Sequence, residues 1–282
     1  MPLKTVLITG CGPGGIGSAL AMEFHLRGHR VIATGLSESL LTHMRERGIE
    51  TVILDVTSRE SIDQAMAHVS KLTHGSLDIL INNAGIMHNM PFTDTDVAAA
   101  RKVLEVNVLG VISVTQAFLP LLLAAAKKHG DALVANIGSI NTEIRPPFFS
   151  IYNASKAAIE VLGASIRTEL APFGVRVVTV KTGSIKSELF NNAPPTKLPE
   201  NSLYLPAKEY IESRIVVKTA ATMEADEYAK KVVSQLLKSN VKPIIWTGGL
   251  AMLAWALSWF GWEGMMDGII IKESQLDKCI IR

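Results

Sequence analysis

The chain has 282 residues, enough for one large domain with a substantial core. Hydrophobic residues make up 48% and charged residues 19%, a balance typical of a globular chain rather than a disordered one. The formal charge is +2 with basic and acidic residues interspersed, so the sequence gives no electrostatic basis for binding nucleic acid. Two cysteines, Cys11 and Cys279, cannot build a disulfide framework and indicate a reducing compartment, which we expect to be the cytoplasm.

Apolar runs rich in β-branched residues alternate with helical patterns along most of the chain. We expect strands at residues 5–9, 30–34, 51–55, 78–82, 132–137, 176–180 and 243–246. This alternation, with nearly unbroken apolar strands, predicts a parallel sheet covered by helices on both faces. The predicted fold class is therefore α/β, a single doubly wound Rossmann-type domain over residues 1–282 with a seven-stranded parallel sheet.

Several helix ends are also visible in the sequence. The first helix is expected to begin near Ser18, and Gly28 and Gly48 follow the first two helices as C-terminal caps. Residues 57–60, Thr-Ser-Arg-Glu, have the spacing of a capping box that opens the third helix.

The segment "TGCGPGGIG" at residues 9–17 directly follows the first predicted strand. Glycine at this density marks either a tight turn or a place where backbone approaches a ligand closely. Its position before a helix favours the ligand, because the helix N-terminus and free amides can hold a pyrophosphate. A second small-residue turn, "NNAG" at residues 82–85, follows the fourth strand at the same sheet edge. It leaves room for a ribose and a nicotinamide, although Asn and Gly are also common in plain turns.

The segment "IYNASK" carries the clearest chemistry, because Tyr152 and Lys156 lie four residues apart on a predicted helix and share a face. A free tyrosine has a pKa of about 10, and a nearby ammonium stabilises the phenolate and lowers that pKa toward the working range. In isolation, such a pair is more common on a solvated helix surface. Ser139 ends the fifth strand at the same edge, and Asn107 lies within a helix, where asparagine usually seeks a side-chain partner. Together the four residues indicate a reaction centre.

These motifs resemble the short-chain dehydrogenase/reductase family, and the resemblance extends over roughly residues 3–240. The family's glycine pattern, T-G-x-x-x-G-x-G, is matched with one extra residue within residues 11–14. The resemblance implies that Asn107, Ser139, Tyr152 and Lys156 are the catalytic tetrad. It implies cofactor contacts from Gly10, Gly12, Gly15, Ile16, Gly17, Asp55, Val56, Asn83, Ala84, Gly85, Tyr152, Lys156, Gly183, Ile185 and Ser187.

A closer resemblance, to the branch with fungal 1-acyldihydroxyacetone-phosphate reductases and hydroxysteroid-dehydrogenase-like enzymes, rests on "GPGGIG", "ELAPFGVRV", "KTGSIKS" and "NNAPPTKLPENSLY". This branch commonly has an arginine after the second strand that meets the 2′-phosphate of NADP, where this chain has Leu36. The acidic residue that would bind the ribose hydroxyls of NAD is also missing from the strand end. Thr34 and Ser37 offer hydroxyls to a phosphate, so we expect NADP(H), with NAD as the alternative.

The family's reaction implies a ketone or aldehyde whose oxygen is held by Ser139 and Tyr152, with hydride arriving from the nicotinamide. Tyr152 is then the proton donor, while Lys156 lowers the phenol pKa and holds the nicotinamide ribose. Asn107 supports a water that returns protons to Lys156. Two other classes stay open: the same fold with a different net reaction, such as isomerisation or cyclisation in natural-product biosynthesis, and a nucleotide-sensing module without turnover. The intact tetrad argues against both.

Residues 184–222 form a long connection with several prolines between the sixth strand and the next helix. Its apolar side chains favour a substrate lid over a disordered loop. The segment Pro146–Phe149 either lines the same pocket or forms a rigid loop. With the lid, it indicates a bulky hydrophobic substrate, such as a lipid, a steroid-like compound or a natural-product intermediate.

The apolar C-terminal extension, residues 243–282, has no charged residue from position 243 to 262. Its length approaches that of a membrane span, but the glycines within residues 247–249 divide it, and we expect no span. One stripe at helical spacing contains Trp255, Trp259 and Trp262. Such a stripe is more typical of a core or a subunit interface than of a lipid-facing or substrate-facing surface. We expect a homo-oligomer, with peripheral membrane or lipid-droplet contact as the alternative, and no metal, because the histidines lack metal-ligand spacing.

Overall fold

The computed structural model describes residues 3–190, 192–215 and 221–279. Seven parallel strands form the main sheet in the order β3-β2-β1-β4-β5-β6-β9, which confirms the predicted fold class. The strands are β1 (Thr5–Ile8), β2 (Arg30–Gly35), β3 (Glu50–Ile53), β4 (Ile79–Asn82), β5 (Ala132–Ile137), β6 (Val175–Thr182) and β9 (Ile244–Thr247). The order reverses between β1 and β4, and in such sheets ligands bind at the carboxyl edge beside this switch point.

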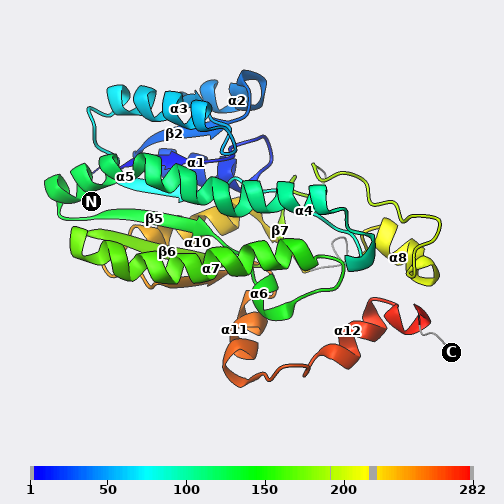
Figure 1. Cartoon of the computed structure of the whole chain (residues 1–282). Helices are drawn as coiled ribbons and strands as arrows, with labels where there is room; N and C mark the ends of the chain where they lie inside the picture. The colour runs from blue at the N-terminus through cyan, green and yellow to red at the C-terminus, as the bar shows by residue number, and fades with distance from the viewer. Residues whose placement is uncertain (1–2, 191, 216–220, 280–282) are drawn as a thin grey trace.

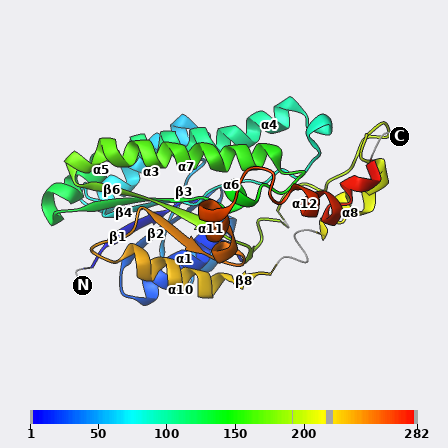
Figure 2. The ribbon, with the colours of Figure 1, turned by 90° about the horizontal axis from the view of Figure 1, so that it is seen from below.

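Helices cover both faces of the sheet, as Figure 2 shows, with α3, α5 and α7 on one side and α1 and α10 on the other. Their bounds are α1 (Ile16–Leu26), α2 (Glu38–Arg45), α3 (Arg59–Leu72), α5 (Gly110–His129), α7 (Ser150–Leu170) and α10 (Ala225–Leu236). Successive residues of a strand pack against the helices on opposite faces of the sheet: Val6 and Ile8 lie in one core cluster and Leu7 in the other. Burial on both faces explains why these strands are continuously apolar.

The helix starts differ slightly from the sequence expectation. Helix α1 begins at Ile16 rather than near Ser18, with Gly15 as its N-cap. Ser58, one residue after the expected Thr57, caps α3 by accepting a hydrogen bond from the Ser61 amide at 3.2 Å. Both expected glycine caps are confirmed, because Gly28 and Gly48 have the left-handed φ values of +81° and +75°.

A long helical segment runs from α4 (Val97–Leu104) through a π-helical turn, η2 (Glu105–Leu109), into α5. Among the described residues it is the one helical stretch long and apolar enough to cross a membrane. Its α5 part instead packs on the sheet, where Val114, Phe118 and Leu122 are fully buried. It is therefore a core helix of this domain.

The insertion at 184–222 leaves and rejoins the domain through a small two-stranded sheet, β7 (Ile185–Lys186) with β8 (Met223–Glu224). Between them lie η4 (Leu205–Ala207) and α8 (Lys208–Glu212). Leu198 of the insertion and Ile211 of α8 are buried beside Phe148. The insertion is thus folded onto the segment that precedes α7.

The C-terminal extension contains α11 (Ala251–Phe260), α12 (Asp267–Glu273) and the 3₁₀ turn η5 (Leu276–Cys279), and Figure 1 shows α12 beside α8. Ala251 and Ala254 of α11 are buried against Ile140. Trp259 and Trp262, however, are 72% and 71% exposed, so of the two expected positions the core is wrong for them, and the subunit interface stays a prediction. The small face of α11 packs inward, and this leaves the large rings outside.

The remaining short elements are η1 (Phe92–Asp94), α6 (Asn141–Ile144) and η3 (Ala171–Phe173). They follow or precede the strands and helices that carry the site, and α6 lies directly after the end of β5.

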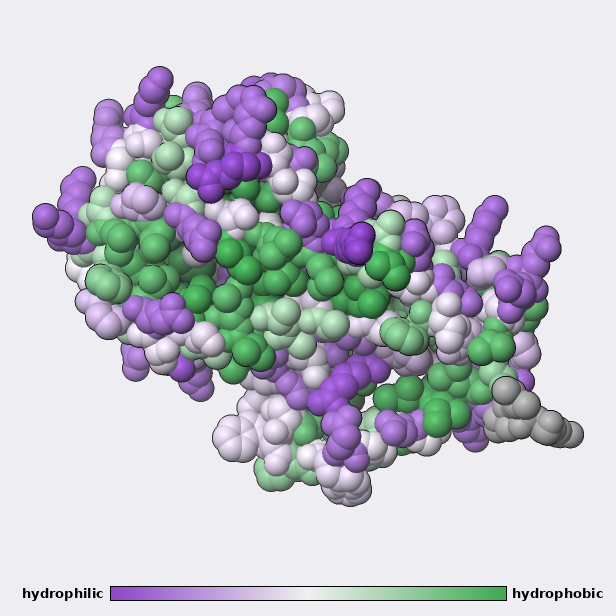
Figure 3. All heavy atoms as spheres, in the orientation of Figure 1, coloured by the Kyte–Doolittle hydropathy of each residue, from purple (hydrophilic) through white to green (hydrophobic). Residues whose placement is uncertain are grey.

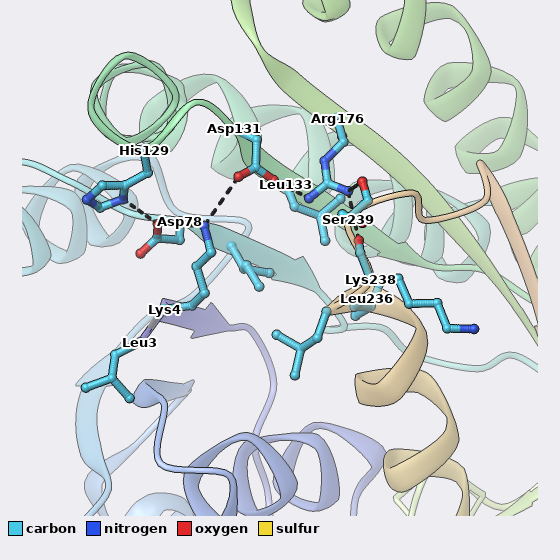
Figure 4. A pocket seen from close by; sticks show the side chains of 12 residues that line it. Leu3, Lys4, Asp78, His129, Asp131, Leu133, Arg176, Leu236, Lys238 and Ser239 are labelled. Carbon is cyan, nitrogen blue, oxygen red and sulfur yellow. Dashed lines mark hydrogen bonds and ion pairs between the residues drawn. The ribbon is translucent and has the colours of Figure 1, made fainter. Parts of the chain in front are cut away.

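A cavity of about 440 Å³ lies at the amino ends of the strands, shown in Figure 4. Its polar wall is an ion network in which Asp78 accepts from the Thr5 amide at 2.8 Å, from His129 Nδ1 at 2.8 Å and from Lys4 Nζ at 3.4 Å. Asp131 pairs with both Lys4 and Arg176. Because this cavity faces the amino edge, it lies opposite the edge where ligands of such folds bind. These ion pairs link the amino ends of β1, β4, β5 and β6.

Candidate active site

The glycine loop lies between β1 and α1, and its own contacts hold it in shape. Ser18, in the first turn of α1, donates to the carbonyl oxygens of Cys11 at 3.0 Å and Gly12 at 2.5 Å. The Cys11 amide donates to the Thr34 carbonyl at 2.7 Å, which fixes the loop against β2. The loop is thus bonded to α1 and to β2, and it lies at the carboxyl edge of the sheet.

Two of the loop glycines are required by the protein itself. Gly10 has a φ of +72°, and an added Cβ there would lie 2.8 Å from the Ala84 Cα. An added Cβ at Gly17 would lie 2.5 Å from both the Gly10 carbonyl oxygen and Asn83 Nδ2. Gly12 differs, because nothing lies within 4 Å of the position its Cβ would take. The open space at Gly12, beside the N-terminus of α1, fits a dinucleotide phosphate.

The turn after β4 is bonded directly to the glycine loop. The Asn83 side chain donates to the carbonyl oxygens of Thr9 at 2.8 Å and Gly10 at 3.0 Å. Thr9 Oγ1 accepts from the backbone amides of Asn83 and Ala84, both at 2.9 Å. A cofactor contact from the Asn83 donors is therefore not expected, because the side-chain NH2 group and the backbone amide already bond to the loop.

Tyr152 and Lys156 lie one turn apart on α7, and both are buried, with exposures of 6% and 7%. Lys156 Nζ lies 5.7 Å from the centre of the Tyr152 ring and donates to the Ile137 carbonyl oxygen at 2.8 Å. Ser139 follows β5 by two residues, is also buried, and interacts with the Tyr152 phenol. The structure thus brings together three residues that the sequence predicted as one site.

Burial controls the ionisation of the pair. It raises the pKa of the Tyr152 phenol to about 12, and the interaction with Ser139 offsets only part of that rise. It lowers the pKa of the Lys156 amine to about 8, because the charged ammonium loses its solvation. The expected lowering of the Tyr152 pKa by Lys156 is not met here, since desolvation is the larger effect. The phenol is protonated at neutral pH.

Asn107, the fourth predicted member, lies in the π-helical turn between α4 and α5 and is 1% exposed. Its Oδ1 accepts from the Ile86 amide at 2.8 Å, and its Nδ2 donates to the Ile86 carbonyl at 2.9 Å. Nδ2 also donates to Ser155 Oγ on α7 at 3.0 Å. The widened turn places this side chain between the turn after β4 and the helix of Tyr152, where an added Cβ at Gly85 would lie 3.3 Å from Oδ1.

The end of β2 shows which hydroxyl can meet a 2′-phosphate. Thr34 is fully buried, and its Oγ1 donates to the Ile8 carbonyl at 3.2 Å, so its hydroxyl is not presented to a ligand. The expectation for the Thr34 side chain is corrected accordingly. Ser37 is the half-buried N-cap of α2, and its hydroxyl lies 2.9 Å from that of Ser39. Leu36 between them is 64% exposed.

The other predicted cofactor residues lie along the same edge. Asp55 follows β3, and its Oδ1 accepts from the Thr57 amide at 2.9 Å and hydroxyl at 2.7 Å. Val56 is buried against Gly110, where an added Cβ would lie 2.8 Å from its Cγ2. Beyond β6, the Gly183 amide donates to the Thr247 carbonyl at 2.8 Å. Ile185 is buried in β7, and Ser187 is half-buried just after it.

An apolar wall covers the Tyr152 ring. The wall contains Met87, Phe149, Leu189, Phe190 and Ala193, which pack in one cluster with Tyr152. Three of these side chains come from the insertion, one from the loop after β4, and one from the segment before α7. Phe149 was anticipated from the sequence, whereas Met87 was missed, because a lone methionine in a loop gives no signal of its own.

Known proteins match most of the length of this chain. Residues 4–198 match the family described as short chain dehydrogenase. The chain belongs to this family. Among its relatives, the short-chain dehydrogenase fogD of Aspergillus ruber is 37% identical over 278 residues, which cover 99% of this chain and 96% of that protein.

A second relative has a more specific description. The NADPH-dependent 1-acyldihydroxyacetone phosphate reductase of Schizosaccharomyces pombe is 38% identical over 258 residues, 87% of this chain and 86% of that protein. Among solved structures, a short-chain dehydrogenase from Streptomyces avermitilis has a TM-score of 0.77 and 28% identity. The match covers 99% of this chain and 97% of the Streptomyces chain. The chain is therefore an oxidoreductase of this family, with a Rossmann fold for a nucleotide cofactor.

Proposed function

We propose that this short-chain dehydrogenase is an NADP(H)-dependent carbonyl reductase that acts on a bulky hydrophobic ketone or the corresponding alcohol. The observation that carries the proposal is the enclosure of the Tyr152 phenol between Ser139, Lys156 and an apolar wall. Small-molecule binding sites are usually lined by apolar side chains with a few polar groups placed to hold the reacting atoms.

The four polar residues divide the work as follows. Ser139 and Tyr152 hydrogen-bond the substrate oxygen, and Tyr152 donates the proton, which its protonated state at neutral pH allows. Lys156 holds a ribose hydroxyl and supplies positive charge near the phenol as negative charge develops there. Asn107 holds the π-helical turn against α7 through Ser155, and it supports a water that returns protons to Lys156. The nicotinamide, when bound, supplies the hydride.

We retain the cofactor contacts proposed from the sequence, except for the Thr34 hydroxyl, which donates to the Ile8 carbonyl. The phosphates belong over Gly12 and the first turn of α1, where the space is open. Preference for NADP(H) is supported by the Ser37 hydroxyl at the end of β2 and by the NADPH-dependent relative. NAD is the alternative, since the arginine expected for a 2′-phosphate is replaced by Leu36.

A substrate screen tests the proposal directly. Purified protein is incubated with a panel of ketones, and the absorbance of NADPH and of NADH is followed in parallel. We expect faster NADPH consumption with bulky ketones than with small polar ones. The Tyr152→Phe variant is expected to bind NADPH normally but to lose about 10²- to 10⁴-fold in turnover.

The same screen separates the two rival classes. Substrate conversion without net NADPH consumption supports an isomerase or cyclase, and NADPH binding without any conversion supports a nucleotide-sensing module. Unchanged turnover in Tyr152→Phe removes the phenol from its proposed role.

We also propose that the chain forms a homo-oligomer through the face made by α5 and α7. Figure 3 shows a continuous apolar band over these helices. Exposed apolar side chains on these helical segments include Val161 of α7, Leu109 of the π-helical turn directly before α5, and Val97 and Leu104 of α4. Sedimentation analysis of Leu109→Glu is expected to give a smaller species than the wild type, and an unchanged mass excludes this face.

Peripheral membrane contact through α11 is a separate proposal, supported by the exposure of Trp259, Phe260 and Trp262. Tryptophan rings are favoured at membrane interfaces. Co-sedimentation with phosphatidylcholine vesicles is expected for the wild type and is expected to be lost on replacing the three rings by serine. If the variant instead changes oligomeric mass without affecting vesicle binding, α11 is a subunit interface. A cytoplasmic enzyme that attaches reversibly to membranes or lipid droplets fits the membrane outcome.

A further inference from the structure

The insertion segment that covers Tyr152 is held by side chains of the insertion's own helical part. Arg214, two residues beyond the end of α8, donates from Nη1 to the Phe190 carbonyl oxygen at 2.7 Å. Its Nη2 donates to the Ala193 carbonyl at 3.1 Å and also to that of Pro194. One guanidinium therefore gathers three backbone carbonyls of the segment whose side chains form the wall.

A neighbouring side chain fixes the far end of the same segment. Glu212, the last residue of α8, accepts a hydrogen bond from the Leu198 amide at 2.9 Å on its Oε1. In the middle, Thr196 Oγ1 donates to the Asn89 carbonyl at 2.9 Å, which joins the segment to the loop after β4. These polar contacts tie the wall segment to α8 and to the loop after β4.

The conformation of Arg214 shows that its placement is costly. Its φ of +54° lies in the left-handed region, which residues other than glycine seldom adopt. Such a conformation persists only where surrounding contacts determine it, and it clusters at ligand clamps and switch regions. Here the Arg214 amide donates to the Ile211 carbonyl of α8 at 3.2 Å, and its side chain makes the three carbonyl bonds to the wall segment.

We propose that Arg214 is a positioning residue for substrate specificity, which clamps Leu189 and Phe190 over Tyr152 and so selects bulky apolar carbonyl compounds. This inference rests on the proposed reductase function for its substrate and on the described contacts for its geometry. A guanidinium suits the task because its planar fork presents several N–H donors at fixed angles. A lysine offers a compact point charge and cannot reach three separated carbonyls together.

The test uses full-length Arg214→Ala and Arg214→Lys, with Lys208→Ala as the matched control. Lys208 is exposed at the start of the same helix, so its loss removes the same charge without touching the wall. For each protein, hydrogen exchange is measured in peptides from residues 186–200. Values of kcat/KM are measured with 2-decalone as a bulky ketone and 2-butanone as a small one.

We expect both Arg214 variants to exchange faster in residues 186–200, while Lys208→Ala matches the wild type. The ratio of kcat/KM for 2-decalone over 2-butanone is expected to fall about tenfold in Arg214→Ala, mainly through KM for 2-decalone. The dissociation constant for NADPH and the melting temperature serve as controls and are expected to stay within about twofold and about 3 °C.

Two outcomes overturn the proposal. Unchanged exchange in Arg214→Ala means that the clamp does not hold the wall, whatever the enzyme does. Wild-type behaviour of Arg214→Lys means that charge alone matters and that the three-carbonyl geometry is irrelevant. If the wild type reduces neither ketone, the reductase function fails for these probes, while the exchange comparison still decides the clamp.

Discussion

Asn107 Nδ2 donates to Ser155 Oγ at 3.0 Å, and this bond joins the π-helical turn before α5 to the catalytic helix α7. Ser155 Oγ in turn donates a hydrogen bond to the Tyr152 carbonyl oxygen at 2.7 Å, and Ser155 is the residue next to Lys156. The position of the turn after β4 is therefore linked, through two side chains, to the backbone that carries the phenol and the amine.

This link makes Asn107 important for both stability and turnover. Asn107→Ala leaves the Ile86 amide and carbonyl and the Ser155 hydroxyl with fewer partners in a buried place. We expect the free energy of unfolding to fall by about 1–3 kcal/mol and kcat to fall about 10- to 100-fold. Urea unfolding and initial rates at saturating substrate measure the two effects. Asn201→Ala, at an exposed asparagine, is the control, and unchanged kcat in Asn107→Ala would confine this residue to a structural role.

Replacing Lys156 by methionine is expected to stabilise the protein while removing activity. The pKa of the buried amine is lowered from 10.5 to about 8, so burying the ammonium destabilises the folded state at pH 7. Between pH 8 and 10.5 the folded state releases this proton before the unfolded state does, so wild-type stability rises with pH. We expect Lys156→Met to be more stable by about 1–3 kcal/mol at pH 7.

The stability difference between Lys156→Met and the wild type is expected to shrink as the pH is raised from 7 to 10, and urea unfolding over this range measures it. The series stops at pH 10 because the pKa of the Tyr152 phenol is raised from 10 to about 12 in the folded state. Above pH 10 the unfolded state loses this proton first, and the folded state is destabilised for that separate reason. A methionine variant that is less stable at every pH would show that the bond from Nζ to the Ile137 carbonyl outweighs the desolvation of the charge.

Gly12→Ala distinguishes a ligand cradle from a plain turn. No described atom lies within 4 Å of the new methyl group, so the free energy of unfolding is expected to stay within about 0.5 kcal/mol of the wild type. If the dinucleotide phosphates lie there, the methyl group will collide with them, and the dissociation constant for NADPH is expected to rise at least about tenfold. Fluorescence titration measures this, with Gly268→Ala as an equally open control. Normal NADPH affinity in Gly12→Ala would place the phosphates elsewhere.

Leu36→Asp is expected to change the cofactor preference. An acidic residue at the end of β2 binds the ribose hydroxyls of NAD and repels a 2′-phosphate. The ratio of kcat/KM for NADPH over NADH is expected to fall at least about tenfold, which parallel initial rates will show. Leu26→Asp, at a leucine that is 73% exposed at the end of α1, controls for the added charge. A ratio that does not move would mean that this strand end is remote from the ribose.

The strands and the reacting residues were predictable from the sequence, because both depend on local patterns. Buried parallel strands need continuous apolar runs, and Tyr152 with Lys156 needs only the helical repeat of four. Ser139 was placed correctly at the edge because the carboxyl ends of parallel strands share one side of the sheet. These features follow from spacing along the chain.

Other features depend on partners that are distant in sequence. Nothing around Asn107 breaks the helical pattern, so the π-helical turn was not foreseen. Thr34 resembled a phosphate ligand until its hydroxyl was found bonded to Ile8 on the neighbouring strand. The Arg214 guanidinium bonds to backbone carbonyls of the wall segment, and such partners leave no trace in residue identities. The raised pKa of Tyr152 reflects burial by the insertion, which spacing does not reveal.

The pairing of Ile185 with Met223 fixes the entry and exit of the insertion side by side. Because its ends are already joined, a change in its length alters the closure free energy little, by about 0.6 kcal/mol per doubling of the loop. Exchanging the insertion would therefore cost little in chain closure. It would replace three side chains of the wall over Tyr152, and so change the burial of the phenol together with the shape of the substrate side, while the seven-stranded sheet stays the same.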